Sequence, residues 1–200
     1  MSAPAMGAQR IAAAAVIALS SLAANAATAA NQPLACSDEA ALAQLDFWVG
    51  DWEVCVGGQR AGRDRVVRIL DGCAITESWT GSDGSRGESL FYYSPSEKQW
   101  RQVWVTDQAL RPGGLKEKHL IARSADGGTR FQGEIALPDG RRILDRTTLR
   151  PAANGSVSQR IEISRDGGES WTMSFDATYH RARVDAASAA GGGGRCGQAE

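Results

Sequence analysis

Between about residues 51 and 181 the chain repeats one pattern, in which short segments of alternating apolar and polar residues are separated by turn-rich loops. The loops, such as "GGQR", "RPGG" and "RDGGES", are rich in residues that adopt positive φ or preset a turn. The segments are rich in β-branched and aromatic residues, which indicates strands with one buried face. Ten strands are predicted, over 51–57, 62–70, 73–80, 86–93, 99–107, 116–124, 129–136, 142–150, 156–165 and 170–180.

Ten consecutive antiparallel strands must either expose two sheet edges or close on themselves. Closure removes edges that would otherwise pair with other chains, so the pattern favours an all-β, up-and-down antiparallel barrel. A β-sandwich is the alternative architecture. Only 38–46, "DEAALAQLD", has helical character, with Ser37 or Asp38 available as its cap. A short helix is therefore expected in front of the first strand.

The N-terminal segment has the composition of a secretory signal peptide. Arg10 precedes the apolar run "IAAAAVIALSSLA", and small residues follow in "ANAATAA". A transmembrane anchor is the alternative, but the run is shorter and less apolar than the roughly 20 residues that a membrane span needs. We expect cleavage near Ala26, a periplasmic or secreted location, and no membrane span after processing.

The remaining chain divides into three predicted parts. Residues 27–36 form a linker, and 37–181 form the barrel domain. The tail 182–200, "ARVDAASAAGGGGRCGQAE", is predicted to be disordered because its small residues bury too little apolar area to offset the entropy of ordering.

Composition narrows the choice of partners. The chain has 200 residues, of which 42% are hydrophobic and 22% charged, and a net charge of -1, which fits one globular domain. No basic run with interleaved aromatic residues occurs, so nucleic acid is not an expected partner. The oligomeric state is not indicated.

Four cysteines, Cys36, Cys55, Cys73 and Cys196, make an even count that favours disulfides in an exported protein. Three pairings are open, as is a free thiol at Cys196 in the tail. His119 and His180 do not stand at ligand spacing from a cysteine or carboxylate pair, so no metal site is predicted. No cofactor motif is found.

A set of motifs resembles one family. Gly50-x-Trp52 after a short helix resembles the entrance signature of lipocalins. "LDFWVGDWEV", "DGCAITESWTGSDGSRGESLFYY", "KQWRQVWV" and "SRDGGESWTMSFDATYHR" are similar to uncharacterised exported bacterial proteins with a lipocalin-like (calycin-type) domain of unknown function. The resemblance covers 36–181 and implies fold and export but no activity. It also implies a Cys36–Cys73 disulfide, since these two cysteines belong to the family pattern.

The entrance residues have a predicted structural role. A barrel of this size needs its bottom filled, and the indoles of Trp48 and Trp52 can bury large apolar areas while each N–H reaches a backbone carbonyl. Arg181 follows the last strand, which an up-and-down order brings beside the first. Stacking of Arg181 over Trp52 would resemble the lipocalin arrangement, and a solvated arginine is the alternative.

Period-two parity identifies candidate lumen residues. Ile75, Glu77 and Trp79 share the bulkier face of their segment. The remaining candidates on shared faces are Trp100, Gln102, Trp104 and Gln159. Polar groups among aromatic and aliphatic side chains are typical of a small-molecule pocket. The alternative is a filled lumen in which Glu77 pairs with an arginine such as Arg146.

Three functional hypotheses follow. The first is an exported protein that binds a small hydrophobic or amphipathic ligand in the lumen. The second is an enzyme in which Glu77, its pKa raised by burial, acts as a general acid or base. The third is an envelope interaction or structural protein with a filled barrel. No catalytic residue set is predicted, because no nucleophile–histidine–acid pattern or phosphate-binding loop is found.

Overall fold

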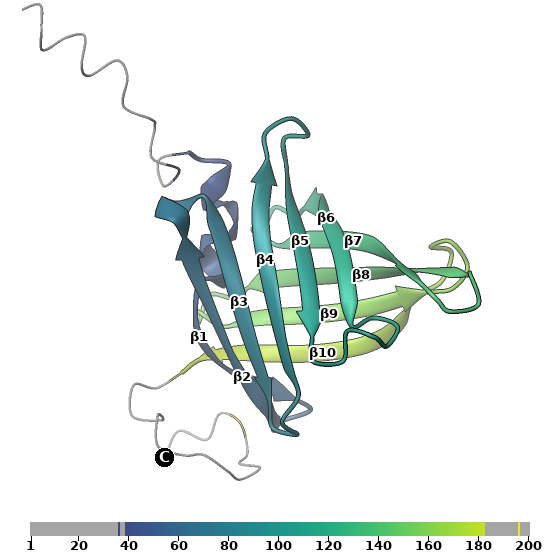
Figure 1. Ribbon diagram of the computed structural model, residues 1–200. Helices are drawn as coiled ribbons and strands as arrows, with labels where there is room; N and C mark the ends of the chain where they lie inside the picture. The colour runs from purple at the N-terminus through teal and green to yellow at the C-terminus, as the bar shows by residue number, and fades with distance from the viewer. Residues whose placement is uncertain (1–35, 37–38, 183–195, 197–200) are drawn as a thin grey trace, which may run out of the picture. The chain divides into compact units, whose positions relative to one another are not determined.

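The computed structural model describes residues 36, 39–182 and 196, which belong to one compact unit, Ala35–Glu200. Ten antiparallel strands form a closed up-and-down barrel, which confirms the predicted all-β architecture (Figure 1). The strands are β1 (Gly50–Val56), β2 (Gln59–Ile69), β3 (Ala74–Gly81), β4 (Arg86–Ser94), β5 (Gln99–Thr106), β6 (Leu115–Arg123), β7 (Thr129–Ala136), β8 (Arg142–Pro151), β9 (Val157–Ser164) and β10 (Thr172–Arg181).

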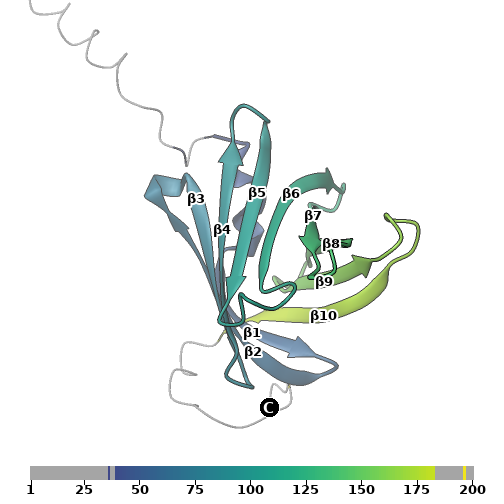
Figure 2. The same cartoon turned by 45° about the vertical axis from the view of Figure 1, so that its right-hand side comes forward.

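The barrel closes between its first and last strands. β1 pairs with β2 on one side and with β10 on the other, and Trp52 lies opposite Arg181 in the β1–β10 register. Figure 2 shows β1 next to β10 at this closure. Every other strand pairs with its neighbours in the sequence, so the sheet has no open edge.

The β1–β2 connection shows how the turn residues determine the hairpins. Only Gly57 and Gly58 separate the two strands, and their φ angles are 56° and 78°. A two-residue hairpin loop of this kind needs positive φ at both positions, which glycine adopts without steric cost. The "GGQR" turn signal therefore corresponds to one tight hairpin.

The helical segment differs from the prediction. In place of a helix over 38–46, a 3₁₀ helix, η2 (Leu42–Trp48), leads into β1, and a second short one, η3 (Leu70–Gly72), joins β2 to β3. Ser37 and Asp38, the predicted caps, lie outside the described residues. A 3₁₀ helix has three residues per turn, so the three-residue spacing of its buried side chains places them on one face.

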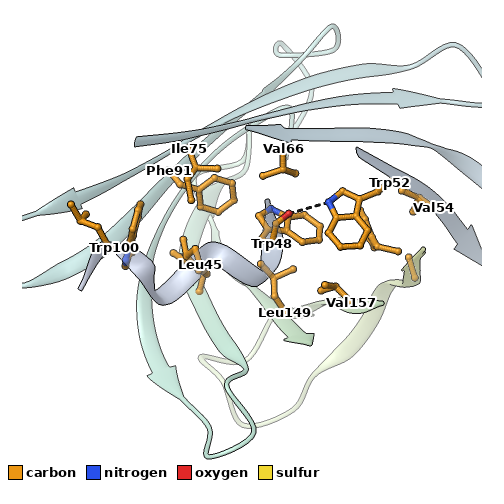
Figure 3. Close-up of a cluster of buried hydrophobic side chains, with 14 residues drawn as sticks. Leu45, Trp48, Trp52, Val54, Val66, Ile75, Phe91, Trp100, Leu149 and Val157 are labelled. Carbon is orange, nitrogen blue, oxygen red and sulfur yellow. Dashed lines mark hydrogen bonds between the residues drawn. The ribbon is translucent and has the colours of Figure 1, made fainter. Parts of the chain in front are cut away.

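We call the end of the barrel beside η2 the apolar end. Its lumen is filled by a cluster of buried hydrophobic side chains, drawn in Figure 3. The helix contributes Leu42, Leu45 and Trp48, and the strands contribute Trp52, Val54, Val66, Ile75, Phe91, Trp100, Phe131, Leu149, Val157, Ala177 and Tyr179.

The entrance tryptophans lie within this cluster. Trp48 and Trp52 are 0% and 1% exposed, and their rings stack with centroids 6.0 Å apart. The Trp52 indole N–H donates to the Trp48 carbonyl at 3.0 Å, whereas the Trp48 indole N–H has no acceptor among the described residues. Only one of the two predicted indole hydrogen bonds is therefore formed in the described part of the chain.

Arg181 lies over the Trp52 ring, with its guanidinium carbon 4.0 Å from the ring centroid. It also donates from Nη1 to the Val49 carbonyl at 2.7 Å. A Cβ atom at Gly50 would lie 1.8 Å from this guanidinium, so the glycine makes the close approach sterically feasible. Of the two interpretations of Arg181, the structure shows the stacked one.

Two disulfides link the four cysteines. Cys36 bonds to Cys73, the pair implied by the family resemblance, and Cys55 bonds to Cys196. Most of the predicted disordered tail lies outside the described residues, but Cys196 is described, and its N–H donates to the Gly58 carbonyl at 3.1 Å. Disulfides are typical of proteins in non-reducing, extracytoplasmic compartments. Residues 1–26 lie outside the described residues, and no described helix is long and apolar enough to cross a membrane.

Candidate functional site

A cavity of about 490 Å³ occupies the lumen beyond the apolar cluster. We call this part of the barrel the cavity end, where the loops 82–85, 107–114 and 165–171 join the strands. The volume lies within the range of small-molecule sites, roughly 300–1,000 Å³. Its lining residues are Ala61, Glu77, Trp79, Ser82, Asp83, Ser85, Gln102, Trp104, Lys116, Lys118, Thr147, Gln159, Ile161, Phe175 and Tyr179.

Five of the six candidate residues from parity line this cavity: Glu77, Trp79, Gln102, Trp104 and Gln159. The sixth, Trp100, shares their face but belongs to the apolar cluster, where it is fully buried and donates from its indole N–H to the Ala41 carbonyl at 2.9 Å. Successive inward positions on a strand are about 6.7 Å apart, so Trp100 lies deeper in the barrel than Gln102. Parity identified the face but not the depth.

Aromatic and aliphatic side chains form the apolar wall of the cavity. Trp79 and Phe175 meet edge to face, with ring centroids 6.5 Å apart. Two glycines make room for the indoles, because a Cβ at Gly62 would lie 2.6 Å from the Trp79 ring and one at Gly87 would lie 2.3 Å from the Trp104 ring. The missing side chains let both indoles pack closely against neighbouring strands.

A hydrogen-bonded chain of polar side chains forms one part of the floor. Glu77 is 4% exposed, and its Oε2 accepts a hydrogen bond from the Ser89 hydroxyl at 2.6 Å. The oxygen of that hydroxyl accepts from the Gln102 amide nitrogen at 3.1 Å. The Gln102 carbonyl oxygen, Oε1, has no partner among the described residues.

A second carboxyl group, Asp64, contacts Glu77 from β2 and is only 2% exposed. Burial raises the pKa of Asp64 well above its usual range, and the nearby Glu77 charge and hydrogen bond raise it further, while the Arg65 backbone N–H opposes the shift. Burial also raises the pKa of Glu77, and hydrogen bonds from Ser89 and Asp64 oppose that shift. Asp64 and Glu77 are therefore a pair of buried carboxyl groups, and burial favours the protonated form of this pair.

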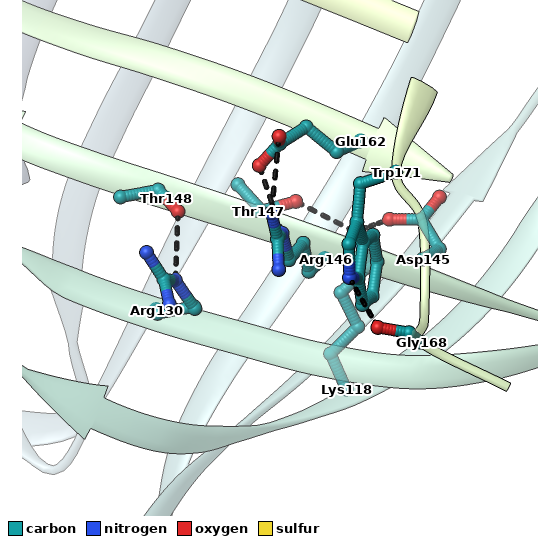
Figure 4. A network of polar contacts seen from close by, with 9 residues as sticks. All are labelled: Lys118, Arg130, Asp145, Arg146, Thr147, Thr148, Glu162, Gly168 and Trp171. Carbon is teal, nitrogen blue, oxygen red and sulfur yellow. Dashed lines mark hydrogen bonds and ion pairs between the residues drawn. The ribbon is translucent and has the colours of Figure 1, made fainter. Parts of the chain in front are cut away.

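A buried ion-pair cluster forms another part of the floor, and Figure 4 shows its Lys118 contacts. The Lys118 ammonium donates to Asp145 and, at 2.6 Å, to the Thr147 hydroxyl. Lys116 contacts the other Asp145 oxygen at 2.7 Å. Burial lowers the pKa of Lys118 to about 8, although the Asp145 charge opposes the shift. The two ammonium groups therefore share Asp145 as their counter-ion.

The alternative prediction, in which Glu77 pairs with an arginine such as Arg146, is wrong for Arg146. Arg146 makes a two-point ion pair with Glu162, with Nε–Oε2 and Nη2–Oε1 distances of 2.8 and 3.1 Å, and its guanidinium stacks over Trp171 at 3.8 Å (Figure 4). Parity explains the error, because Arg146 alternates with the inward residues Asp145 and Thr147 and so belongs to the outer face of β8.

Sequence reasoning missed several polar residues of the lumen, namely Asp64, Ser89, Lys116, Lys118, Asp145 and Thr147. Only the period-two alternation could have indicated that these residues face the lumen. Lys116 and Lys118 alternate with outward residues in the same way as their partners on β5, Trp104 and Gln102. Charged residues on one strand face usually indicate the solvent side, and here the barrel register turns them inward. Tyr179, whose hydroxyl donates to Gln159 Oε1 at 2.7 Å, completes the polar floor.

Comparison with known proteins adds no assignment: no family model matches the chain, and a search of curated proteins finds no match.

Proposed function

We propose that this chain is an exported, lipocalin-like binding protein that holds a small amphipathic ligand in the barrel lumen. The observation that carries the proposal is the cavity, which combines an aromatic wall with a polar floor. Such an apolar lining with a few placed polar groups is the usual composition of small-molecule sites. An amphipathic molecule satisfies both surfaces, with its apolar body against Trp79 and Trp104 and its polar group towards Glu77.

The closure of the apolar end supports the lipocalin-like comparison. A short helix precedes Gly50-x-Trp52, and Arg181 stacks over Trp52. Lipocalin barrels have eight strands, whereas this barrel has ten, so the comparison rests on how this end is closed and not on strand number. The function rests on the cavity, because a shared fold does not by itself imply a shared function.

Native mass spectrometry and tryptophan fluorescence test this proposal together. We expect the purified mature protein to carry or take up a small molecule, and a panel of fatty acids, quinones, aromatic acids and aromatic amines to include a ligand that shifts the fluorescence to saturation. The double variant Trp79→Phe/Trp104→Phe removes both indoles from the cavity wall, so most of the shift should disappear.

Trp100→Phe is the matched control, because it removes an indole from the apolar end of the same sheet. This variant should keep the ligand-induced shift. A protein that contains no extra mass and shows no saturable change with any compound would contradict lumen binding and leave the filled-barrel hypothesis.

The enzyme hypothesis keeps one supporting observation. Glu77 combines a raised pKa with direct access to the cavity, which are two properties of a general acid. Incubation of a ligand with the protein, followed by mass spectrometry of the recovered ligand, distinguishes the two functions. A binding protein leaves the ligand unchanged, whereas an enzyme converts it.

A further inference from the structure

The polar floor offers hydrogen-bond acceptors to a ligand. The Ser89 hydroxyl has a single proton, and it is used on Glu77. Ser89 Oγ can therefore only accept a hydrogen bond from Gln102, so the amide nitrogen of Gln102 points towards Ser89. The carbonyl oxygen of Gln102 has no partner among the described residues, although this side chain is only 7% exposed. Glu77 and Gln102 both line the cavity, so a bound group must donate hydrogen bonds to fit there.

The cations of the lumen are already engaged, which disfavours an anionic ligand. Lys118 donates to Asp145 and Thr147, and Lys116 pairs with Asp145. A ligand carboxylate would have to compete with Asp145, which is 0% exposed and cannot turn to solvent. No described donor of normal hydrogen-bond geometry reaches either oxygen of the buried Asp64.

We propose that the ligand carries a cationic nitrogen on an apolar body, and that this nitrogen binds Glu77 and Gln102 and replaces a proton of the Asp64–Glu77 pair. This inference rests on the proposed lumen binding. One carboxyl O–H bond of the pair breaks, its proton leaves to solvent, and the ligand cation replaces it as the positive partner of the two carboxylates. Trp79 and Trp104 present aromatic rings beside this position, where a cation gains a further attraction.

The charged and titratable groups around the pair determine the pH dependence. They are Glu88 on β4, Lys116 and Lys118 on β6, Asp145 on β8 and Tyr179 on β10, with Asp83 in the loop after β3. Arg65 on β2 contributes only its backbone N–H, because its exposed guanidinium pairs with Asp51. Burial raises the pKa of Tyr179 well above its usual range, so the phenol stays neutral. A cation bound at Glu77 lies next to the pair, so its charge favours loss of the pair's proton.

The sign of the effect follows from proton release. At low pH the pair is protonated, so the cation must displace a proton and binds weakly. As pH rises, affinity increases, by up to about tenfold per pH unit for one released proton, until both carboxylates are ionised. Above pH 8 the loss of charge on Lys118 acts in the same direction.

Isothermal titration calorimetry with three probes of one shape tests the head group. Naphthylmethylammonium, naphthylmethanol and naphthylacetate share a bicyclic body and differ in charge. We expect the ammonium compound to bind about tenfold or more tighter than the alcohol, since charge-assisted hydrogen bonds are roughly twice as strong as neutral ones, and the acetate to bind weakest. Buffers of different ionisation enthalpy should reveal protons released with the ammonium probe.

Variants locate the effect. Glu77→Gln should reduce the preference for the cation to less than about threefold, whereas Asp64→Asn should keep the preference and reduce proton release. Glu88→Gln is the matched control, because Glu88 lies on the outer face of β4, where it accepts from Ser78. Thermal melts verify that each variant folds. If Glu77→Gln fails to fold, the proton release of Asp64→Asn still tests the inference.

The outcomes separate the two proposals. Equal binding of all three probes, tighter binding of naphthylacetate, or unaltered proton release in Asp64→Asn would overturn the cation inference while lumen binding stands. Absence of binding by every probe, together with an empty protein in the mass spectrum, would remove the proposed function and this inference with it.

Discussion

The two ends of the lumen are built from the same strands and have opposite character. At the apolar end, fourteen hydrophobic residues fill the interior, and Trp48, Trp52 and Trp100 are all at most 1% exposed. At the cavity end, the interior is hollow and buries Asp64, Glu77, Lys118 and Asp145. Apolar burial stabilises a fold, whereas buried charges at best compensate their own desolvation. The apolar end therefore contributes most of the stabilising burial, and the cavity end holds the proposed ligand site.

β5 illustrates the change along a single strand. Its inward positions are Trp100, Gln102 and Trp104, which run from the apolar cluster through the polar floor to the cavity wall. The first packs against η2, the second joins the Ser89–Glu77 chain, and the third lies over Gly87. One alternating strand therefore supplies both ends, and its side chains differ in role with their depth in the barrel.

The largest expected effect comes from truncating one tryptophan at each end. Trp48→Ala should lower the free energy of unfolding by about 3–5 kcal/mol, because it removes a fully buried indole and leaves a cavity that the barrel cannot fill. Trp79→Ala should lower it by less than about 1.5 kcal/mol, since one face of that indole already borders the cavity. Urea denaturation measures both, and equal losses would contradict the division between the ends.

A smaller, pH-dependent effect is expected from the acid pair. The pKa of Asp64 is raised in the folded state, so between its unfolded and folded pKa values the folded protein binds more protons than the unfolded one. Stability of the wild type should therefore fall as pH rises through this range. Asn at position 64 keeps the shape and is neutral, as a protonated Asp64 is, so Asp64→Asn should be within about 1 kcal/mol of the wild type at acidic pH.

The same variant should be at least as stable as the wild type at neutral pH, with a flatter dependence of stability on pH. Urea titrations at several pH values measure this difference. Glu88→Gln, on the outer face, should keep the wild-type slope, and a slope that Asp64→Asn leaves unaltered would show that the protons are taken up elsewhere.

The smallest expected effect concerns the rim of the apolar end. Arg181→Met should cost about 0.5–1 kcal/mol, because it removes a solvent-exposed cation–π contact with Trp52 and a hydrogen bond to Val49 while keeping apolar cover. Arg181→Lys should recover only part of this loss, since an ammonium lacks the planar face that stacks on the indole. Thermal melts measure the series, and a loss equal to that of Trp48→Ala would show that Arg181 is part of the core.

The sequence by itself determined the strand order, the turns and the inward faces, because a period of two and glycine-rich loops are local properties of the chain. Gly57 and Gly58 define a hairpin without any distant contact, and Ile75, Glu77 and Trp79 share a face in any sheet. The segment before β1 was recognised as helical but not as 3₁₀, since packing of Leu45 and Trp48 in the lumen determines its pitch and its end.

Only the tertiary structure decided which inward residues meet and at what depth. Asp64 and Glu77 come from different strands, and Lys118 and Asp145 are separated by 27 residues, so neither contact has a local signal. The register around a closed barrel brings these charges to one level of the lumen and places Trp100 at another. Arg146 was expected to be the partner of Glu77, but alternation on β8 places it outside with Glu162, because a one-residue step along a strand reverses the face that a side chain occupies.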